Sequence, residues 1–221
     1  MALTVMLDVD GTLVDNSYFH TLAWWYAFRD HGIEAEMAVI HRLIGMGGDQ
    51  LVPALTGRDM PELEESHSRH YRERIDDVPV LPGASDLILE LHRRDVIVCV
   101  ATSSNREDLD RLLARLETSS LIDTIVCGDD VGASKPAPDL VAVALRVTGA
   151  QPESAVLVGD TRWDIEAAGR VGVPCVAVCS GGWSADELRQ AGAAGVHDDV
   201  AALLARFDDS FLGRRLRAVV L

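Results

Sequence analysis

Two carboxylates follow the first apolar run of the chain. Asp8 and Asp10 stand two positions apart after residues 3–7, and Gly11 comes directly after them. A glycine directly after the two acids lets the chain turn, so that both can face one cavity. The pattern favours a functional pair of carboxylates, and the simpler alternative is a solvated strand end followed by a turn.

Hydroxyl side chains follow another apolar run. Residues 98–101 lead into Thr102, Ser103, Ser104 and Asn105, just before a helical pattern. Hydroxyls and free backbone N–H groups at the start of a helix form a cradle for an anion. Ordinary helix capping by the same residue types explains this pattern at least as well.

The chain holds a single lysine. Lys135 is the one Lys among 20 basic residues, and Pro136 and Pro138 fix the backbone just after it. An ammonium is a compact point charge, whereas the guanidinium of arginine is a planar fork, so the two side chains are not interchangeable. The position of Lys135 in a proline-pinned loop indicates a specific role for that point charge.

Two further carboxylates follow a third apolar run. Asp160 comes after residues 156–158 and Gly159, and Asp164 stands four positions later. Helix capping by Asp160 is the simpler explanation, but it does not explain why an acid again follows an apolar strand.

The elements that must position these residues alternate along the chain. Short apolar runs predict strands, and periodic patterns between them predict helices. The predicted strands are 3–7, 96–101, 124–127, 155–158 and 175–178, and the predicted helices are 84–93, 107–116, 139–147 and 164–171. This alternation predicts an α/β fold with a doubly wound parallel sheet, in which the carboxyl ends of the strands meet at the site.

One long stretch interrupts this alternation. Residues 16–79 contain helix-like segments punctuated by glycines and no convincing strand, and the chain returns through prolines at 79 and 82. We therefore expect a catalytic core formed by 1–15 and 80–221, with 16–79 inserted as a helical cap domain.

Carboxylates gathered at one sheet edge need a cation. At an effective dielectric near 20, each pair within ~4 Å costs about 4 kcal/mol. Oxygen ligands favour Mg²⁺, and Lys135 with the nearby hydroxyls would then provide a site for an anion. These parts suggest a Mg²⁺-bound phosphoryl group beside an aspartate.

The order and spacing of these segments resemble the four motifs of the haloacid dehalogenase-like (HAD) superfamily over nearly the whole chain. The matching segments are Asp8-Val9-Asp10-Gly11-Thr12-Leu13-Val14-Asp15, Thr102, Lys135-Pro136 and Gly159-Asp160 with Asp164. The resemblance implies a Rossmann-like core with a small α-helical cap. Within the family, the chain is most similar to the phosphoglycolate phosphatase and β-phosphoglucomutase-like branch.

The resemblance also implies a role for each matched residue. Asp8 would be the nucleophile that forms an aspartyl-phosphate, and Asp10 the general acid and then the general base. Asp8, Asp160 and the backbone carbonyl of Asp10 would hold Mg²⁺, supported by Asp164. The phosphate would be bound by Thr102, by the N–H of Ser103 and by Lys135.

Residue types separate the branches of the family. A dehalogenase needs neither Mg²⁺ nor Asp10, and a phosphonoacetaldehyde hydrolase needs a cap lysine, which residues 16–79 lack. A transport ATPase would carry Thr at position 10. The resemblance thus favours a Mg²⁺-dependent phosphatase acting on a phosphoglycolate-like or sugar-phosphate-like metabolite. A mutase of the β-phosphoglucomutase type is the alternative, followed by a non-catalytic binding or regulatory module.

Three cap residues are candidates for contact with the substrate. His20 would face the site from the first cap helix, and Arg42 would bind a substrate carboxylate through two hydrogen bonds. Gly48 stands where a mutase often carries a basic residue for its second phosphate. Each has a simpler structural explanation: a packed or surface histidine, a solvated arginine and a helix–helix connection.

Composition limits the partners. The 221 residues are 48% hydrophobic and carry a net charge of −15, which is typical of a globular protein that repels nucleic acid. The chain has no basic leader and no apolar run long enough for a membrane, and its four cysteines lie mostly in apolar runs. We expect a cytoplasmic monomer or homodimer with buried thiols, whose partner is a small phosphorylated metabolite.

Overall fold

A parallel sheet organises the chain. The computed structural model describes residues 2–220, except for the side chains of Val219 and Val220, so the two ends of the predicted core at Met1 and Leu221 lie outside the described residues. Within this range lies one six-stranded sheet of order β3-β2-β1-β4-β5-β6, with every neighbouring pair parallel. The strands are β1 (Thr4–Leu7), β2 (Ile97–Ala101), β3 (Thr124–Val126), β4 (Ala155–Gly159), β5 (Cys175–Val178) and β6 (Gly195–His197).

Helices cover both faces of this sheet, because alternate strand residues point into two separate apolar layers. Val5 and Leu7 belong to one layer and Met6 to the other. The first layer is covered by α5 (Ala84–Arg93), α6 (Arg106–Leu113), α10 (Val200–Ala205) and α11 (Phe211–Val220). The second is covered by α7 (Asp139–Thr148), α8 (Arg162–Arg170) and α9 (Ala185–Gln190).

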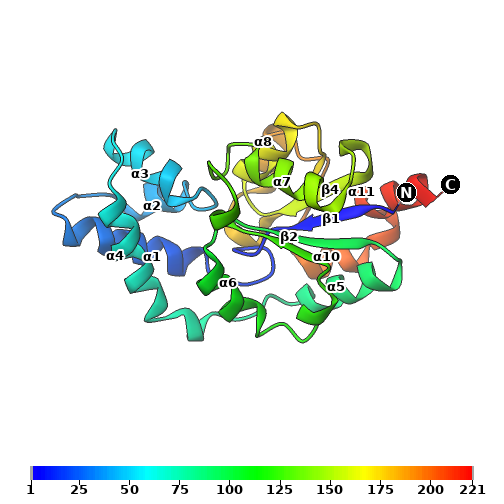
Figure 1. Cartoon of the computed structure of the whole chain (residues 1–221), viewed down its shortest axis with the longest axis horizontal. Coiled ribbons are helices and arrows are strands. Elements are labelled where there is room, and N and C mark those ends of the chain that lie inside the picture. Colours follow the sequence, from blue (N-terminus) through cyan, green and yellow to red (C-terminus); the bar gives the residue numbers. More distant parts are fainter. Residues whose placement is uncertain (1, 221) are drawn as a thin grey trace.

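A helical cap is inserted between β1 and α5, and it lies beyond one end of the sheet (Figure 1). It contains α1 (Ser17–Asp30), α2 (Met37–His41), α3 (Gly48–Thr56) and α4 (Pro61–Arg72). Trp24, Phe28, Leu51 and Leu63 belong to an apolar cluster of its own. Short 3₁₀ turns connect the other elements at Ile75–Asp77, Ser119–Leu121, Gly128–Asp130, Pro152–Ser154, Cys179–Gly181 and Phe207–Asp209.

The predicted fold class is confirmed: a doubly wound parallel α/β sheet carries an inserted helical cap. All five predicted strands are present, and the four predicted helices are displaced by at most a few residues at their ends. The strand β6 was missed, because three residues that are all half-buried leave no periodic pattern to detect.

No helix within residues 2–220 is long and apolar enough to cross a membrane. The thiols of Cys99, Cys127 and Cys175 are buried and that of Cys179 is half-buried, all four being free.

Candidate active site

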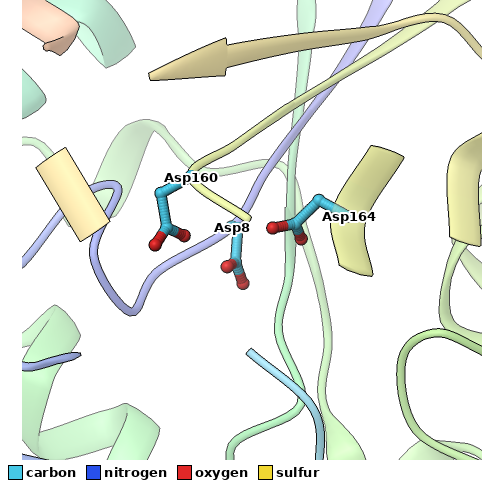
Figure 2. A group of neighbouring side chains, drawn as sticks. All are labelled: Asp8, Asp160 and Asp164. Carbon is cyan, nitrogen blue, oxygen red and sulfur yellow. The ribbon is translucent and has the colours of Figure 1, made fainter. Parts of the chain in front are cut away.

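Three aspartates meet where β1 and β4 end. Asp8 directly follows β1, and its backbone N–H donates to the carbonyl of Val158 in β4 over 2.9 Å. Asp160 follows β4, and Asp164 lies in the first turn of α8. The three carboxylates point toward a common centre (Figure 2), and one oxygen from each lies within 4.8 Å of the others. The parallel sheet therefore gathers acids that are distant in sequence.

Lys135 neutralises part of this charge. Its Nζ lies 2.8 Å from Oδ1 of Asp8 and 2.7 Å from Oδ1 of Asp164, and its side chain is 1% exposed. Burial disfavours the ammonium, but Asp164 and Asp8 outweigh burial and raise the pKa of Lys135. One fixed positive charge thus faces three buried carboxylates.

The carboxylates retain an excess of negative charge. Burial raises the pKa of Asp8 to about 8, despite Lys135 and with added repulsion from Asp164. Burial and the same kind of repulsion raise the pKa of Asp160 well above its usual range. Oδ2 of Asp8 has no hydrogen-bond partner among the described residues. A buried group of this kind fits a divalent cation, and a donor set made only of oxygen suits Mg²⁺.

Glycines make room for the Asp160 carboxylate. A Cβ at Gly181 would lie 1.6 Å from Oδ2 of Asp160, and one at Gly11 would lie 2.4 Å from the same atom. Gly11 also has a φ of 72°, which residues with a side chain rarely adopt. Thr12 donates from Oγ1 to Oδ1 of Asp160 over 3.3 Å. Backbone from two loops therefore closes around one carboxylate.

Asp164 is fixed by its own helix start. Its Oδ2 accepts hydrogen bonds from the backbone N–H of Thr161 at 3.0 Å and from Oγ1 of Thr161 at 2.6 Å. Its Oδ1 accepts from Lys135 over 2.7 Å. Both oxygens are held by the protein, which fits a supporting position beside the two other aspartates.

The Asp10 side chain turns away from this group toward the cap. It accepts hydrogen bonds from Asn16 and, over 2.6 Å, from Oγ of Ser104, and it lies 3.3 Å from Nε2 of His20. Burial would raise the pKa of Asp10, but His20 and the hydrogen-bond donors outweigh burial and hold this pKa well below its usual range. Asp10 is therefore ionised in this arrangement, and its side chain is not one of the three grouped carboxylates.

The hydroxyls after β2 lie beside Asp10. Oγ1 of Thr102 is 3.4 Å from Oδ2 of Asp10 and accepts a hydrogen bond from the N–H of Ser104 over 3.2 Å. Ser103 lines a pocket between cap and core, and its Oγ lies 3.5 Å from the carbonyl oxygen of Gly45 in the cap.

The pocket has a volume of about 300 Å³ and is lined by both parts of the chain. Asp8, Asp10 and Lys135 line it from the core, and His20 and Gly48 line it from the cap. Two of the three cap candidates, His20 and Gly48, therefore line this pocket.

Arg42 lies elsewhere. Its guanidinium pairs with Glu187 and stacks over the Trp183 ring at 3.4 Å from the centroid. It is not among the described residues that line the pocket. Arg42 joins the cap to the core in this structure through these two contacts.

Sequence reasoning did not assign several residues of the site. Asn16 and Ser104 contact Asp10, and His67 lies 3.1 Å from His20. The position of Ser104 next to Ser103 was an available signal. Asn16 and His67 gave none, because their role depends on how the cap packs against the core.

Comparison with known proteins agrees with this geometry. Residues 5–178 match the family model described as haloacid dehalogenase-like hydrolase. The phosphoglycolate phosphatase of Aquifex aeolicus is 31% identical, over 76% of this chain and 80% of that protein. The validoxylamine A 7'-phosphate phosphatase of Streptomyces hygroscopicus subsp. limoneus is 27% identical, over 80% of this chain and 85% of that protein.

A solved structure of a hydrolase from Pseudomonas syringae matches with a TM-score of 0.89 and 33% identity, and the match covers 95% of this chain and 99% of that one. The fold, the order of the motifs and the gathered aspartates all agree with the family match. The chain is therefore an enzyme of the haloacid dehalogenase-like hydrolase family.

Proposed function

We propose that the protein is a Mg²⁺-dependent phosphatase that hydrolyses a small phosphorylated metabolite through an aspartyl-phosphate at Asp8. The state of Asp8 carries the proposal. Its carboxylate is buried, lies 2.8 Å from Lys135 through Oδ1, has no hydrogen-bond partner for Oδ2 among the described residues, and lines the pocket. A carboxylate placed beside a fixed cation and open to a cavity suits a nucleophile.

The residues that would hold the metal are Asp8, Asp160 and the backbone carbonyl of Asp10, supported by Asp164. The all-oxygen donor set and the excess negative charge support this assignment. When bound, Mg²⁺ would offset the charges of the nucleophile and of the phosphoryl group, so that the two can approach.

The first half-reaction transfers the phosphoryl group to the protein. An oxygen of Asp8 forms a bond to phosphorus as the bond from phosphorus to the leaving oxygen breaks. Asp10 donates a proton to that oxygen, which departs as an alcohol. Nε2 of His20 lies 3.3 Å from Oδ1 of Asp10, so this ring is placed to assist the transfer.

The second half-reaction regenerates the free carboxylate of Asp8. Asp10 accepts a proton from water, and the water oxygen attacks phosphorus as the bond to Asp8 breaks and inorganic phosphate leaves. Thr102, the N–H of Ser103 and Lys135 hold the phosphoryl oxygens throughout. A loose transition state asks mainly for positioning and charge, which these residues supply.

Residues 16–79 act as the cap domain over a core made of 1–15 and 80–221. The two connections pair with each other, since Asp15 donates to the carbonyl of Pro79 and Leu81 to that of Leu13, both over 2.9 Å. Such a paired hinge lets the cap open for substrate and close to exclude water.

Both relatives named above are phosphatases, which supports a phosphatase over a mutase or a non-catalytic module. The test is phosphate release from a panel of phosphorylated metabolites, with Mg²⁺ or with EDTA. Release that requires Mg²⁺ and is lost in Asp8→Asn supports the proposal. A folded protein that releases no phosphate, or releases it equally in EDTA, refutes it.

A further inference from the structure

The pocket wall contributed by the cap carries negative charge. Asp49 and Glu64, from α3 and α4, both line the pocket. Neither carboxylate forms an ion pair within the described part of the chain, and Glu64 also accepts no hydrogen bond there. Burial, Asp49 and Asp59 raise the pKa of Glu64, the direction expected of a carboxylate that lacks a cation.

The described part of the same wall contains no Lys or Arg, and its His20 lies beside Asp10. Among the described residues that line the pocket, Lys135 is the single Lys or Arg, and it is already engaged by Asp8 and Asp164. Burial lowers the pKa of His67 well below its usual range, so this ring is neutral. Two other pocket acids, both from the core, have partners: Asp108 is paired with Arg72, and Asp129 accepts a hydrogen bond from the backbone N–H of Arg106.

The absence of a side chain at position 48 makes room for the Glu64 carboxylate. A Cβ on Gly48 would lie 2.6 Å from Cδ of Glu64, so the glycine lets the Glu64 carboxylate lie against the start of α3. Asp49 is held from the cap against the core. Its Oδ2 accepts a hydrogen bond over 3.0 Å from the N–H of Ser134, in the core loop that carries Lys135. One pocket thus holds a buried unpartnered oxygen of Asp8 at the core end and two unpaired carboxylates at the cap end.

A substrate that spans this pocket would meet different charges at its two ends. Its phosphate lies at Asp8 and Lys135, and its leaving group faces Asp49 and Glu64. A second anion on the leaving group would be repelled there without any cation to pair with, whereas an ammonium would be attracted. We infer that the leaving group of the substrate carries a protonated amine that pairs with Glu64 and Asp49. This inference rests on the proposed phosphatase function and narrows its substrate class to aminated alcohol or sugar phosphates.

Three esters of matched size test it: phosphoethanolamine, 2-hydroxyethyl phosphate and 2-phosphoglycolate carry an ammonium, a hydroxyl and a carboxylate at the same place. Glucosamine 6-phosphate and glucose 6-phosphate form a larger matched pair. For the wild type we expect kcat/KM to fall in the order ammonium, hydroxyl, carboxylate, with about tenfold or more between the first and last. Glu64→Gln should lower the preference for ammonium over hydroxyl by about threefold or more, and Asp49→Asn should act in the same direction.

Glu65→Gln is the matched control, because Glu65 is exposed on the same helix, like Glu64, but does not line the pocket. It should keep the wild-type order of the esters. If the wild type prefers the carboxylate or the hydroxyl ester, or if Glu64→Gln leaves the preference unchanged, the inference is overturned while the phosphatase function stands. If none of the five esters releases phosphate while another member of the metabolite panel does, the inference is overturned and the phosphatase function stands. If the folded Mg²⁺-loaded protein releases phosphate from no member of the panel, both are overturned.

Discussion

The ammonium of Lys135 lies 2.8 Å from Oδ1 of Asp8, and both side chains are almost completely buried. The single lysine of the chain therefore contacts the proposed nucleophile directly. It also reaches Asp164 over 2.7 Å, so one cation bridges the ends of β1 and α8. The contact between Lys135 and Asp8 affects both the stability and the proposed activity of the protein. Substitutions of Lys135 and of Asp8 should separate these two effects.

Removal of the Lys135 ammonium should lower both the stability and the activity of the protein. In Lys135→Met, three buried carboxylates lose their one fixed counter-charge, so we expect the metal-free protein to lose about 3 kcal/mol of unfolding free energy. We expect kcat/KM to fall about 10³-fold, because the phosphoryl group loses the same charge. Urea unfolding and phosphate-release kinetics measure the two effects. A variant of wild-type stability would show that Lys135 does not offset the charge of the aspartates.

Removal of one carboxylate should have the opposite effect on stability. Asp8→Asn relieves repulsion from Asp164 and Asp10, so the metal-free variant should be more stable than wild type by about 1–3 kcal/mol near pH 7.5 while activity is lost. Added Mg²⁺ should stabilise wild type more than the variant. Urea unfolding with and without Mg²⁺ measures this. Equal stabilisation of both proteins by Mg²⁺ would argue against Asp8 as a ligand.

The stability of the metal-free protein should depend on pH. The folded-state pKa of Asp8 is raised to about 8, so the folded protein binds more protons than the unfolded chain above about pH 4. Its unfolding free energy should therefore fall as the pH rises from about 4 to about 8, by at most roughly 1.4 kcal/mol per pH unit for this group. The lowered pKa of Asp10 affects stability in another pH range: its contribution to the unfolding free energy is lost as the pH falls below about 4. Unfolding in EDTA across this range should show the slope, and saturating Mg²⁺ or Asp8→Asn should reduce it. A flat profile in EDTA would contradict the raised pKa.

His20 should matter most for poor leaving groups. Because Nε2 of His20 lies 3.3 Å from Oδ1 of Asp10, the proposed general acid, His20→Asn should lower kcat for an alkyl phosphate by about 10- to 100-fold. With p-nitrophenyl phosphate, whose leaving group needs little protonation, the first half-reaction should fall far less. His70→Asn is the control, since His70 pairs with Asp30 on the cap surface. Equal losses of first-step rate for both esters would rule out a role of His20 in proton delivery.

Arg42 should act on cap closure and not on substrate charge. Arg42→Ala removes its pair with Glu187 and its stacking on Trp183, and because both groups are partly exposed the free energy of unfolding should fall only slightly. The ratio of kcat/KM for 2-phosphoglycolate to that for 2-hydroxyethyl phosphate should stay within about twofold of wild type. A selective loss of phosphoglycolate turnover would instead place Arg42 at the substrate.

The core could be predicted from sequence further than the cap. Buried parallel strands carry a strong apolar signal, and their carboxyl ends must converge, so the proximity of Asp8, Asp160, Asp164 and Lys135 follows from fold class and motif order. The cap has no such rule. Whether Arg42 or Glu64 faces the pocket depends on how short helices pack, and α-helical periodicity alone does not determine it.

The hydrogen bonds around Asp10 could not be predicted from the sequence for the same reason. Its partners come from the cap connection, from α1 and from the loop after β2, which meet only once the cap is seated. The acids at strand ends predicted which carboxylates lie close together, and the hydroxyls after the next strand lie beside Asp10. The charge of the cap wall became visible only with the pocket lining.

The most direct test of the central claim is to trap the phosphoryl group on Asp8. Asp10→Asn with p-nitrophenyl phosphate and Mg²⁺ should transfer the phosphoryl group readily but hydrolyse the intermediate slowly, because only the second half-reaction then lacks its base. We predict a burst of about one equivalent of p-nitrophenol per site. Borohydride reduction of the quenched protein should then convert residue 8 to homoserine, detected by peptide mass spectrometry. Turnover without a burst, or reduction at a residue other than Asp8, would contradict the account.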